Sequence, residues 1–262
     1  MASTRQLKTR IRSVGNTKQI TRAMQMVAAS KMRRSQEATK ASTPYTSAGG
    51  ELLMDLATHI KTQDHPLFAR REIKSRLIVF IASDKGLAGA YNANVSKKYL
   101  ELLKRDDERG IKNLTLTVGR KASQFATRLK DTEVIGSYDD LPDHPAGLAF
   151  RTILNTILEQ FIEEKVDAVT LVYTDFVSSV VQEARWQRLL PAGTTISSSE
   201  TDDPEPAKEV KYEPNAEVVL NEVVRRMIGA RIFQALLDAR ASEHSMRMLA
   251  MKNATDNAAD LI

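Results

Sequence analysis

Residues 214–262 decide the fold, and they read PNAEVVLNEVVRRMIGARIFQALLDARASEHSMRMLAMKNATDNAADLI. Apolar side chains recur there at spacings of three and four residues from Leu220 to Ala250, which is the pattern of an apolar helix face. At 1.5 Å per residue such a helix is about 70 Å long. A compact domain cannot cover a helix of that length, so a second long element is expected to lie against it.

The other end of the chain provides this second element. Leu7, Ile11 and Val14 follow the same spacing, and residues 20–28 continue it with a narrow face of alanines and methionines. We expect a helix from about residue 4 to about residue 60, with a bend or break in the forties at Pro44. Two such helices are expected to wind around each other as an antiparallel coiled coil, so that the chain ends form one rod.

The middle of the chain has a different period and predicts an α/β domain at residues 76–192. Short apolar runs alternate with helical stretches, which implies a small parallel sheet with right-handed crossovers and leaves the middle as a globular head. Alternation within 176–190 favours a further strand. The other expected elements are strands at 77–82, 114–118, near 134 and at 168–173, and helices at 92–109, 121–129 and 148–164.

The predicted domain order is therefore an N-terminal coiled-coil helix at 1–60, the middle domain at 76–192, a loop at 193–209, and a C-terminal coiled-coil helix at 214–262. The loop is rich in serine, proline and acidic residues and has almost nothing to bury. Such a composition favours a flexible acidic loop.

Composition excludes several classes of protein. The chain has 262 residues and no cysteine, which rules out disulfides, thiolate metal sites and cysteine nucleophiles. No apolar run approaches the roughly 20 residues of a membrane span, and the first residues do not form a secretory signal. We expect a soluble protein that stays inside its compartment.

The search for catalytic chemistry is mostly negative. The four histidines have no metal-ligand spacing, and no nucleophile elbow is present. Residues 83–89 read SDKGLAG and fall where a strand turns into a helix, a place where backbone N–H groups can hold a phosphate. The stretch matches neither nucleotide-binding glycine motif, so a tight turn is the simpler interpretation and a nucleotide enzyme the rival one. We expect no catalytic residue, no metal and no cofactor.

Charge is concentrated at the N-terminus. Residues 1–40 hold ten Lys or Arg side chains and the single acid Glu37, a net charge of +9, whereas the whole chain carries +5. This favours an acidic or polyanionic partner. The alternative from another class is a basic coiled-coil protein that binds nucleic acid through this segment, with steep salt dependence.

Three stretches make the resemblance specific. KQITRAMQMVAASKM at 18–32 and ASEHSMRMLAMKNATDNA at 241–258 resemble the two signature blocks of the ATP synthase gamma subunit, and DKGLAGAYN at 84–92 is similar to a third block of that family. The resemblance is collinear over the whole chain. It implies a rotor shaft with a Rossmann-like α/β middle domain.

The resemblance also implies the function and the partners. In the family, the rod of terminal helices stands inside a ring of alpha and beta subunits, and the lower part rests on the membrane ring of c subunits and holds epsilon. Proton flow turns the ring and the shaft. The shaft has no threefold symmetry, so its rotation changes the conformational energies of the catalytic beta sites in sequence. The chain itself is expected to be non-catalytic.

Site residues follow from the positions of the matched blocks. Lys18, Arg22, Met24 and Lys31 are expected near the lever loops of the beta subunits. Polar contacts higher in the alpha/beta collar are expected for Glu243, Arg247 and Lys252, and contacts near the c ring for Tyr212 and Glu213.

Two further expectations concern the chain end and the location. The sequence stops at Leu261-Ile262 in the middle of the helical period, whereas the family's helix continues for several turns, so either the sequence is truncated or the upper bearing is missing. The absence of cysteine and of a transit segment favours the cytoplasmic face of a bacterial plasma membrane, with the matrix face of the mitochondrial inner membrane as the alternative.

Overall fold

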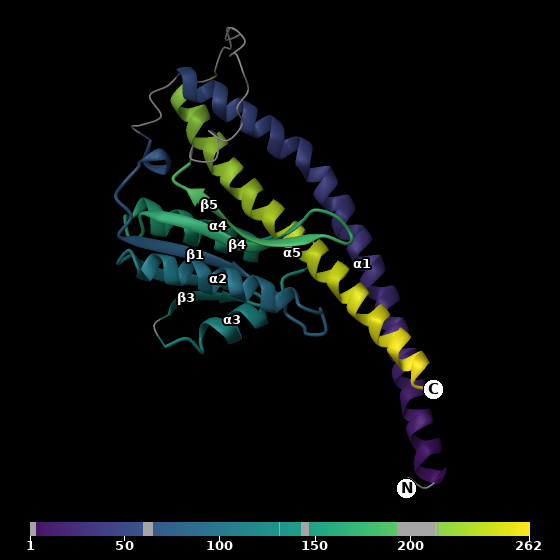
Figure 1. The fold of residues 1–262 in the computed structure, drawn as a ribbon. Coiled ribbons are helices and arrows are strands. Elements are labelled where there is room, and N and C mark those ends of the chain that lie inside the picture. Colours follow the sequence, from purple (N-terminus) through teal and green to yellow (C-terminus); the bar gives the residue numbers. More distant parts are fainter. Residues whose placement is uncertain (1–3, 60–64, 131, 143–146, 193–212, 214) are drawn as a thin grey trace.

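The computed structural model describes residues 4–59, 65–130, 132–142, 147–192, 213 and 215–262. Two long helices, α1 (Thr4–His59) and α5 (Ala216–Asp260), run side by side in opposite directions (Figure 1). The expected α/β fold with a long antiparallel pair of terminal helices is confirmed. The predicted loop at 193–209 lies outside the described residues.

The sheet has five strands in the order β3-β2-β1-β4-β5. Four strands are parallel, and β5 (Gln182–Leu190) joins the edge antiparallel to β4 (Ala168–Phe176). The other strands are β1 (Ser75–Ile81), β2 (Lys112–Val118) and β3 (Glu133–Tyr138). The remaining helices are α2 (Tyr91–Asp107), α3 (Arg120–Ala126), α4 (Leu148–Ile162) and the short 3-10 helix η2 (Pro66–Phe68).

Alternating side chains of β1 build a core on each face of the sheet. Leu77, Val79 and Ile81 belong to the core with α4 and α5, whereas Ile78 and Phe80 belong to the core with α2 and α3. A strand that is apolar on both faces is typical of a parallel sheet covered by helices. This explains why β1 and β4 appear in the sequence as continuous apolar runs.

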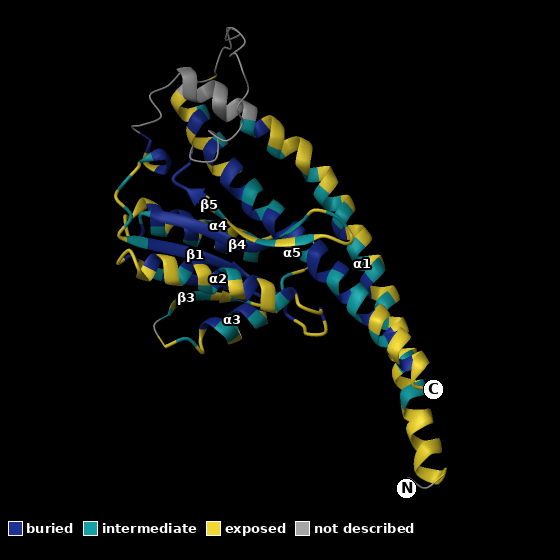
Figure 2. Cartoon of the chain, in the orientation of Figure 1, coloured by how far each residue is buried: buried dark blue, intermediate teal, exposed yellow. Residues whose placement is uncertain are grey.

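The first half of α5 is a layer of the middle domain rather than a free rod. Leu220, Val224, Ile228, Ile232 and Leu236 are buried in the same core as the sheet, and Figure 2 shows buried stretches along this half of the helix, alternating with exposed ones near its start. The expectation that both terminal helices stand apart from a globular head is therefore wrong for α5. The sheet supplies apolar surface for one side of the helix and α1 covers the other.

Small residues of α1 line its side of the seam with α5. Thr21 and Thr255 bring their Oγ1 atoms to 2.8 Å, Ser42 Oγ donates to Gln234 Oε1, and Gly49 lies directly against Met227. In each pair the two residue numbers add up to 276, and the positions on α1 differ by multiples of seven. The buried Ala28 and Ser35 continue the same series. A seven-residue repeat is the period of a left-handed coiled coil.

Pro44 lies inside α1, so the break that the sequence offered as one of two outcomes there is not found. The helix is continuous from Thr4 to His59. Proline removes the backbone donor that the Lys40 carbonyl would use. Threonine hydroxyls add hydrogen bonds to other carbonyls of this turn: Thr43 Oγ1 donates to the Thr39 carbonyl at 2.9 Å, and Thr46 Oγ1 donates to the Thr43 carbonyl at 2.8 Å. Pro44 is also exposed, so its ring does not disturb the seam.

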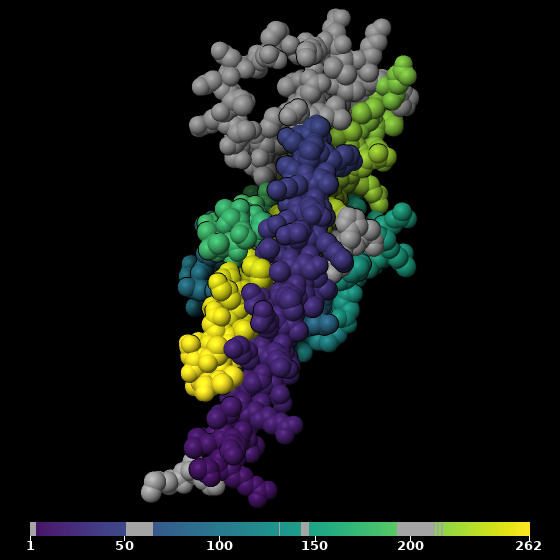
Figure 3. Space-filling model, turned by 90° about the vertical axis from the view of Figure 1, so that its right-hand side faces the viewer, coloured from purple at the N-terminus to yellow at the C-terminus, as the bar shows by residue number. Residues whose placement is uncertain are grey.

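The N-terminal part of α1 extends beyond the end of α5. Figure 3 shows α1 running lengthwise over this face of the molecule, with the C-terminal part of α5 beside it and the first turns of α1 projecting further. Leu7 and Ile11 are half exposed there. No helix among the described residues is both long and apolar enough to cross a bilayer.

Candidate partner-binding surface

The three sequence blocks meet at one hollow. It measures about 700 Å³ and lies between α1, α5 and the loops that follow β1 and β3. Its charged lining holds both signs, with lysines from α1 and the β1 loop. The lining residues are Ala23, Met24, Val27, Ala28, Lys31, Asp84, Lys85, Gly86, Leu87, Asp140, Leu141, Pro142, Arg240, Glu243, His244 and Arg247.

Asp84 is the hub of this hollow. Its Oδ1 accepts the backbone N–H groups of Arg120 and Asp140 at 3.1 and 3.0 Å, and its Oδ2 accepts from Arg240 at 3.1 Å. Burial acts to raise the pKa of Asp84, but these hydrogen bonds and the Arg240 charge outweigh it and hold the pKa below its usual value. The carboxylate therefore stays charged and ties the ends of three strands to α5.

Three charged side chains of α5 complete the arrangement. Glu243 lies between two arginines: Arg240 Nη1 donates to its Oε2 at 3.1 Å, and Arg247 Nη2 donates to its Oε1 at 2.7 Å. Arg247 also donates to the carbonyls of Lys85 and Gly86 at 3.1 and 3.2 Å. The block 241–258 is thus bound to the loop 84–86 inside the chain.

The predicted site residues differ in their surroundings. Met24, Lys31, Glu243 and Arg247 line the hollow, and Arg22 and Lys252 are exposed on α1 and α5. Lys18 is half-buried further along α1. Glu243 and Arg247 are only 4% and 9% exposed, because they are held in the ion pairs of the chain itself. Glu213 is exposed next to the start of α5, and Tyr212 lies outside the described residues.

Comparison with known proteins gives the family. The family model described as ATP synthase matches residues 3–262. The ATP synthase gamma chain of Moorella thermoacetica is 39% identical over 262 residues, which cover all of this chain and 89% of that protein. The gamma chain of Stenotrophomonas maltophilia strain K279a is 40% identical, with 100% and 90% covered.

The chain belongs to the ATP synthase gamma family.

Solved structures agree with this membership. The central stalk and c-ring structure of the Tetrahymena thermophila mitochondrial ATP synthase contains a chain that is 28% identical, with a TM-score of 0.66, covering 90% of this chain and 99% of that one. The rotor of the Euglena gracilis mitochondrial ATP synthase has a chain of the same fold at a TM-score of 0.63, with 16% identity and coverage of 97% and 91%. As a gamma-family member the chain is a non-catalytic rotor subunit of a membrane-associated complex.

The gamma fold fills the place where a Rossmann-like sheet binds nucleotides. That place is the crevice at the carboxyl ends of the strands where the strand order reverses, here between β1 and β4. The helix α5 lies across it, and Ser242 Oγ donates to the Thr174 carbonyl at 3.4 Å. The loop 83–89 supplies a carboxylate to its neighbours, because Asp84 accepts the backbone N–H groups of Arg120 and Asp140. Membership of the gamma family, whose subunit is non-catalytic, replaces the nucleotide-enzyme interpretation.

A close glycine contact shapes the same edge of the sheet. Gly119 has φ +93, and a Cβ there would lie 2.2 Å from the Ala82 carbonyl oxygen. Only glycine permits this approach. It places the Arg120 N–H beside Asp84.

Among the described residues, no group of three His, Asp or Glu side chains could hold a metal ion.

The central residues of the hollow were missed by sequence analysis. Arg240 appeared only as part of a helical pattern, and Asp84, Lys85 and Leu87 only as parts of a turn. Leu87 is 63% exposed and has φ +60, which is rare for a leucine. Gly86 and Gly89, on either side of Leu87, were the sequence feature that could have indicated this, because they mark a tight turn in which an apolar side chain can be exposed.

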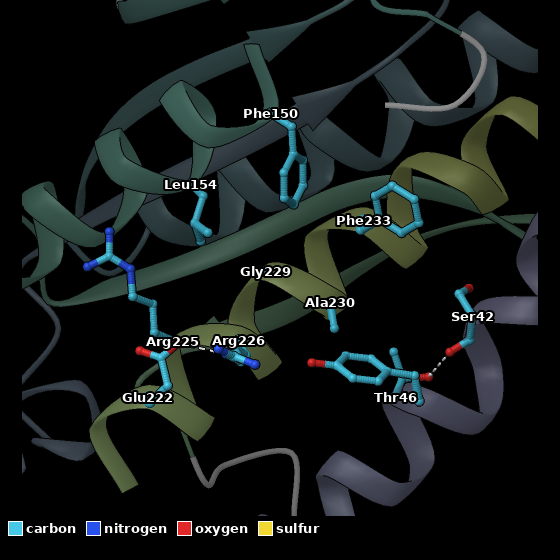
Figure 4. A pocket seen from close by; sticks show the side chains of 11 residues that line it. Ser42, Thr46, Phe150, Leu154, Glu222, Arg225, Arg226, Gly229, Ala230 and Phe233 are labelled. Atoms are coloured by element: carbon cyan, nitrogen blue, oxygen red, sulfur yellow. Dashed lines mark hydrogen bonds and ion pairs between the residues drawn. The ribbon is translucent and has the colours of Figure 1, made fainter. Parts of the chain in front are cut away.

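A second hollow lies near the start of α5. It measures about 490 Å³ and is mainly apolar, with Phe150 and Leu154 projecting from α4, Phe233 from α5, and Ser42 and Thr46 from α1 (Figure 4). The Phe150 and Phe233 rings meet edge to face at 5.8 Å. This hollow contains none of the predicted site residues.

Proposed function

We propose that the chain is the central shaft of an F-type ATP synthase, which couples proton-driven rotation of a c ring to conformational changes at the catalytic beta subunits. The observation that supports this most strongly is the antiparallel α1–α5 pair, which continues beyond the sheet as a rod (Figure 1). A rod of this kind inside a ring exposes each ring subunit to a different face. Rotation then changes the relative energies of their conformations.

The proposed collar surface is the outer face of α1 and the hollow beside it. Arg22 is exposed, and so are the neighbouring Met26 and Val27, at 62% and 58%. Cationic side chains next to flexible apolar ones suit an acidic protein loop that must bind and then slide. We assign Lys18, Arg22, Met24, Lys31 and Lys252 to direct contact with alpha or beta subunits. Glu243 and Arg247 are proposed to act through the ion pairs that hold α5.

The proposed foot is at the opposite end of the molecule. Glu213 precedes α5, whose start lies far from the N-terminus of α1 in Figure 1. We propose that Glu213, together with Tyr212, contacts the c ring, and that epsilon binds the same lower part. The complex would then lie on the cytoplasmic face of a bacterial plasma membrane, since the curated relatives above are bacterial.

Co-purification tests the proposal. Tagged chain expressed with its alpha and beta subunits should purify with both in a complex that hydrolyses ATP. The salt concentration should stay moderate, because screening weakens charged contacts. Recovery of the chain alone, or with nucleic acid in place of these subunits, would refute the rotor function.

Charge reversal tests the surface. Arg22→Glu should lower ATP-driven proton transport by about threefold or more, because it places a negative charge against an acidic loop. Lys97→Glu is the matched control, since Lys97 is an exposed cation on α2 away from the hollow. Equal transport in the two variants would refute the electrostatic contact at Arg22.

A further inference from the structure

The helix α5 leaves the apolar core of the sheet at Arg240. Ala239 is its last residue in that core. Beyond it, α5 contacts α1, loops and the ends of two strands: Ser242 Oγ donates to the Thr174 carbonyl of β4 at 3.4 Å, and Gln182 Nε2 of β5 donates to Ser245 Oγ at 3.3 Å. In the loops, Ser245 Oγ donates to the Ser179 carbonyl at 2.6 Å, and a Cβ on Gly89 would lie 3.7 Å from Ala250 Cβ. Figure 1 shows the C-terminal part of α5 and the N-terminal part of α1 continuing beyond the sheet. Whatever holds α5 here sets the direction of the rod.

Arg240 joins three separate segments with one guanidinium. Its Nη2 donates to Asp84 Oδ2 at 3.1 Å and to the Leu141 carbonyl at 2.8 Å, and its Nη1 donates to Glu243 Oε2 at 3.1 Å. The Arg240 side chain is 13% exposed. These charge-assisted bonds are therefore largely shielded from water.

Asp84 passes this attachment on to the sheet. It lies three residues after the end of β1, and its other oxygen accepts the N–H groups of Arg120 and Asp140, which follow β2 and β3. The carboxyl ends of three strands are therefore fixed to one side chain of α5. The planar fork of arginine suits such a junction, because it donates in several fixed directions at once.

Apolar packing alone would not fix this direction. The contacts of α5 with the sheet in this core are made by Leu, Val, Ile and Ala side chains, and the hydrophobic effect that drives them is non-directional. Twenty residues separate Arg240 from Asp260, which is about 30 Å of helix. A tilt of about 5° at Arg240 would move the helix end by about 3 Å.

We propose that Arg240 is a positioning residue, which fixes the direction in which the α1–α5 rod leaves the sheet by holding α5 to Asp84 and to the Leu141 carbonyl. The importance of that direction for rotation rests on the proposed function. The direction itself is a property of the chain alone, so it is tested without partners.

The test measures a distance across the junction. The full chain has no cysteine, so Lys97→Cys on α2 and Asp256→Cys on α5 give two unique sites for spin labels. Both residues are exposed. The doubly labelled chain should show one narrow distance distribution. Adding Arg240→Met should widen it at least about twofold, because the rod then samples several directions.

Matched variants separate positioning from general stability. Arg226→Met removes an exposed ion pair with Glu222 on the same helix and should leave the distribution unchanged. Arg240→Lys keeps the charge but loses the fork, so it should give an intermediate width and partial rescue. Circular dichroism should show equal helix content in all variants.

The proposal is overturned if Arg240→Met leaves the distance distribution as narrow as in the parent. It is also overturned if both Arg240→Met and Asp84→Asn fail to fold, because the ion pair would then maintain the fold rather than the direction of the rod. If the parent chain does not purify with alpha and beta subunits, the proposed function is refuted. The distance test does not depend on that outcome, because it measures the direction of the rod in the chain alone.

Discussion

At the scale of single residues, Asp238 carries the clearest pH dependence. It lies buried on α5, and burial together with the nearby charge of Asp175 raises its pKa to about 7. Hydrogen bonding from Gln234 and the charge of Arg185 offset only part of this. In the unfolded chain the same carboxyl has a pKa of about 3.9. Between about pH 4 and pH 7, the Asp238 carboxyl is therefore protonated in the folded state and ionised in the unfolded state.

The sign of the effect follows. The contribution of Asp238 to stability is fully present below about pH 4 and is lost as the pH rises to about 7. Asp238→Asn imitates the protonated acid, so its melting temperature should exceed that of the parent by several degrees at pH 8, with the gap closing towards pH 4.5. Melting curves across this range decide the matter. A gap that does not change with pH would show that Asp238 does not titrate there.

Gly119 gives a second prediction at this scale. Gly119→Ala should destabilise the chain by more than about 2 kcal/mol, because its Cβ would overlap the Ala82 carbonyl at a positive φ. Gly15→Ala is the control, because Gly15 lies within the helix α1 and a Cβ at this position would meet nothing within 4 Å. It should be neutral or stabilising by up to about 1 kcal/mol. Urea midpoints compare the two, and equal midpoints would contradict the close approach at Gly119.

At the scale of elements, the seam between α1 and α5 has one defined register. The pairs Thr21 with Thr255 and Ser42 with Gln234 both belong to the series whose residue numbers add up to 276. Thr21→Cys with Thr255→Cys should form a disulfide under mild oxidation, because the two side chains already meet at 2.8 Å. The chain has no other cysteine to compete.

A shifted pair tests the register. Thr21→Cys with Met248→Cys is one heptad out of step, about 10 Å along the helix, and should stay reduced. Gel mobility with and without reductant reports both pairs. A disulfide in the shifted pair and none in the matched pair would mean that the helices pack in another register.

The sequence predicted most elements because their apolar patterns have a local cause. The runs that became β1 and β4 are apolar on both faces, and the helical period of residues 214–262 is continuous. The double role of α5 was not predictable in the same way. The helical period predicts that Leu220 and Met227 are buried. It does not predict that Leu220 packs against the sheet and Met227 against α1.

The candidate site could be predicted only in part. Met24 and Lys31 were predicted as contact residues because they lie in a block with a family pattern, and they line the hollow. Arg240 depends on contacts with residues about 100 and 156 positions away, Leu141 and Asp84, and no local pattern records such distances. The burial of Glu243 and Arg247 has the same origin. From sequence alone, a charged side chain on a helix is expected to be exposed to solvent. Its burial becomes evident only when the tertiary structure shows its ion-pair partners.

At the scale of the whole molecule, the structure combines a rigid head with a long lever. Two cores enclose the sheet, α5 belongs to both the head and the rod, and α1 runs along the rod to its projecting end. Continuity through α5 means that a turn of the head is also a turn of the rod. This is the property that the gamma family requires of a shaft, and it does not depend on any catalytic group.

Rotation tests this account most directly. The assembled complex is fixed to a surface through its beta subunits, and a bead is attached to Lys97→Cys on α2, an exposed position on the head. The account predicts that the bead turns in one direction when ATP is added and stops when ATP is exhausted. A bead that shows only Brownian motion while the same complexes hydrolyse ATP would contradict it.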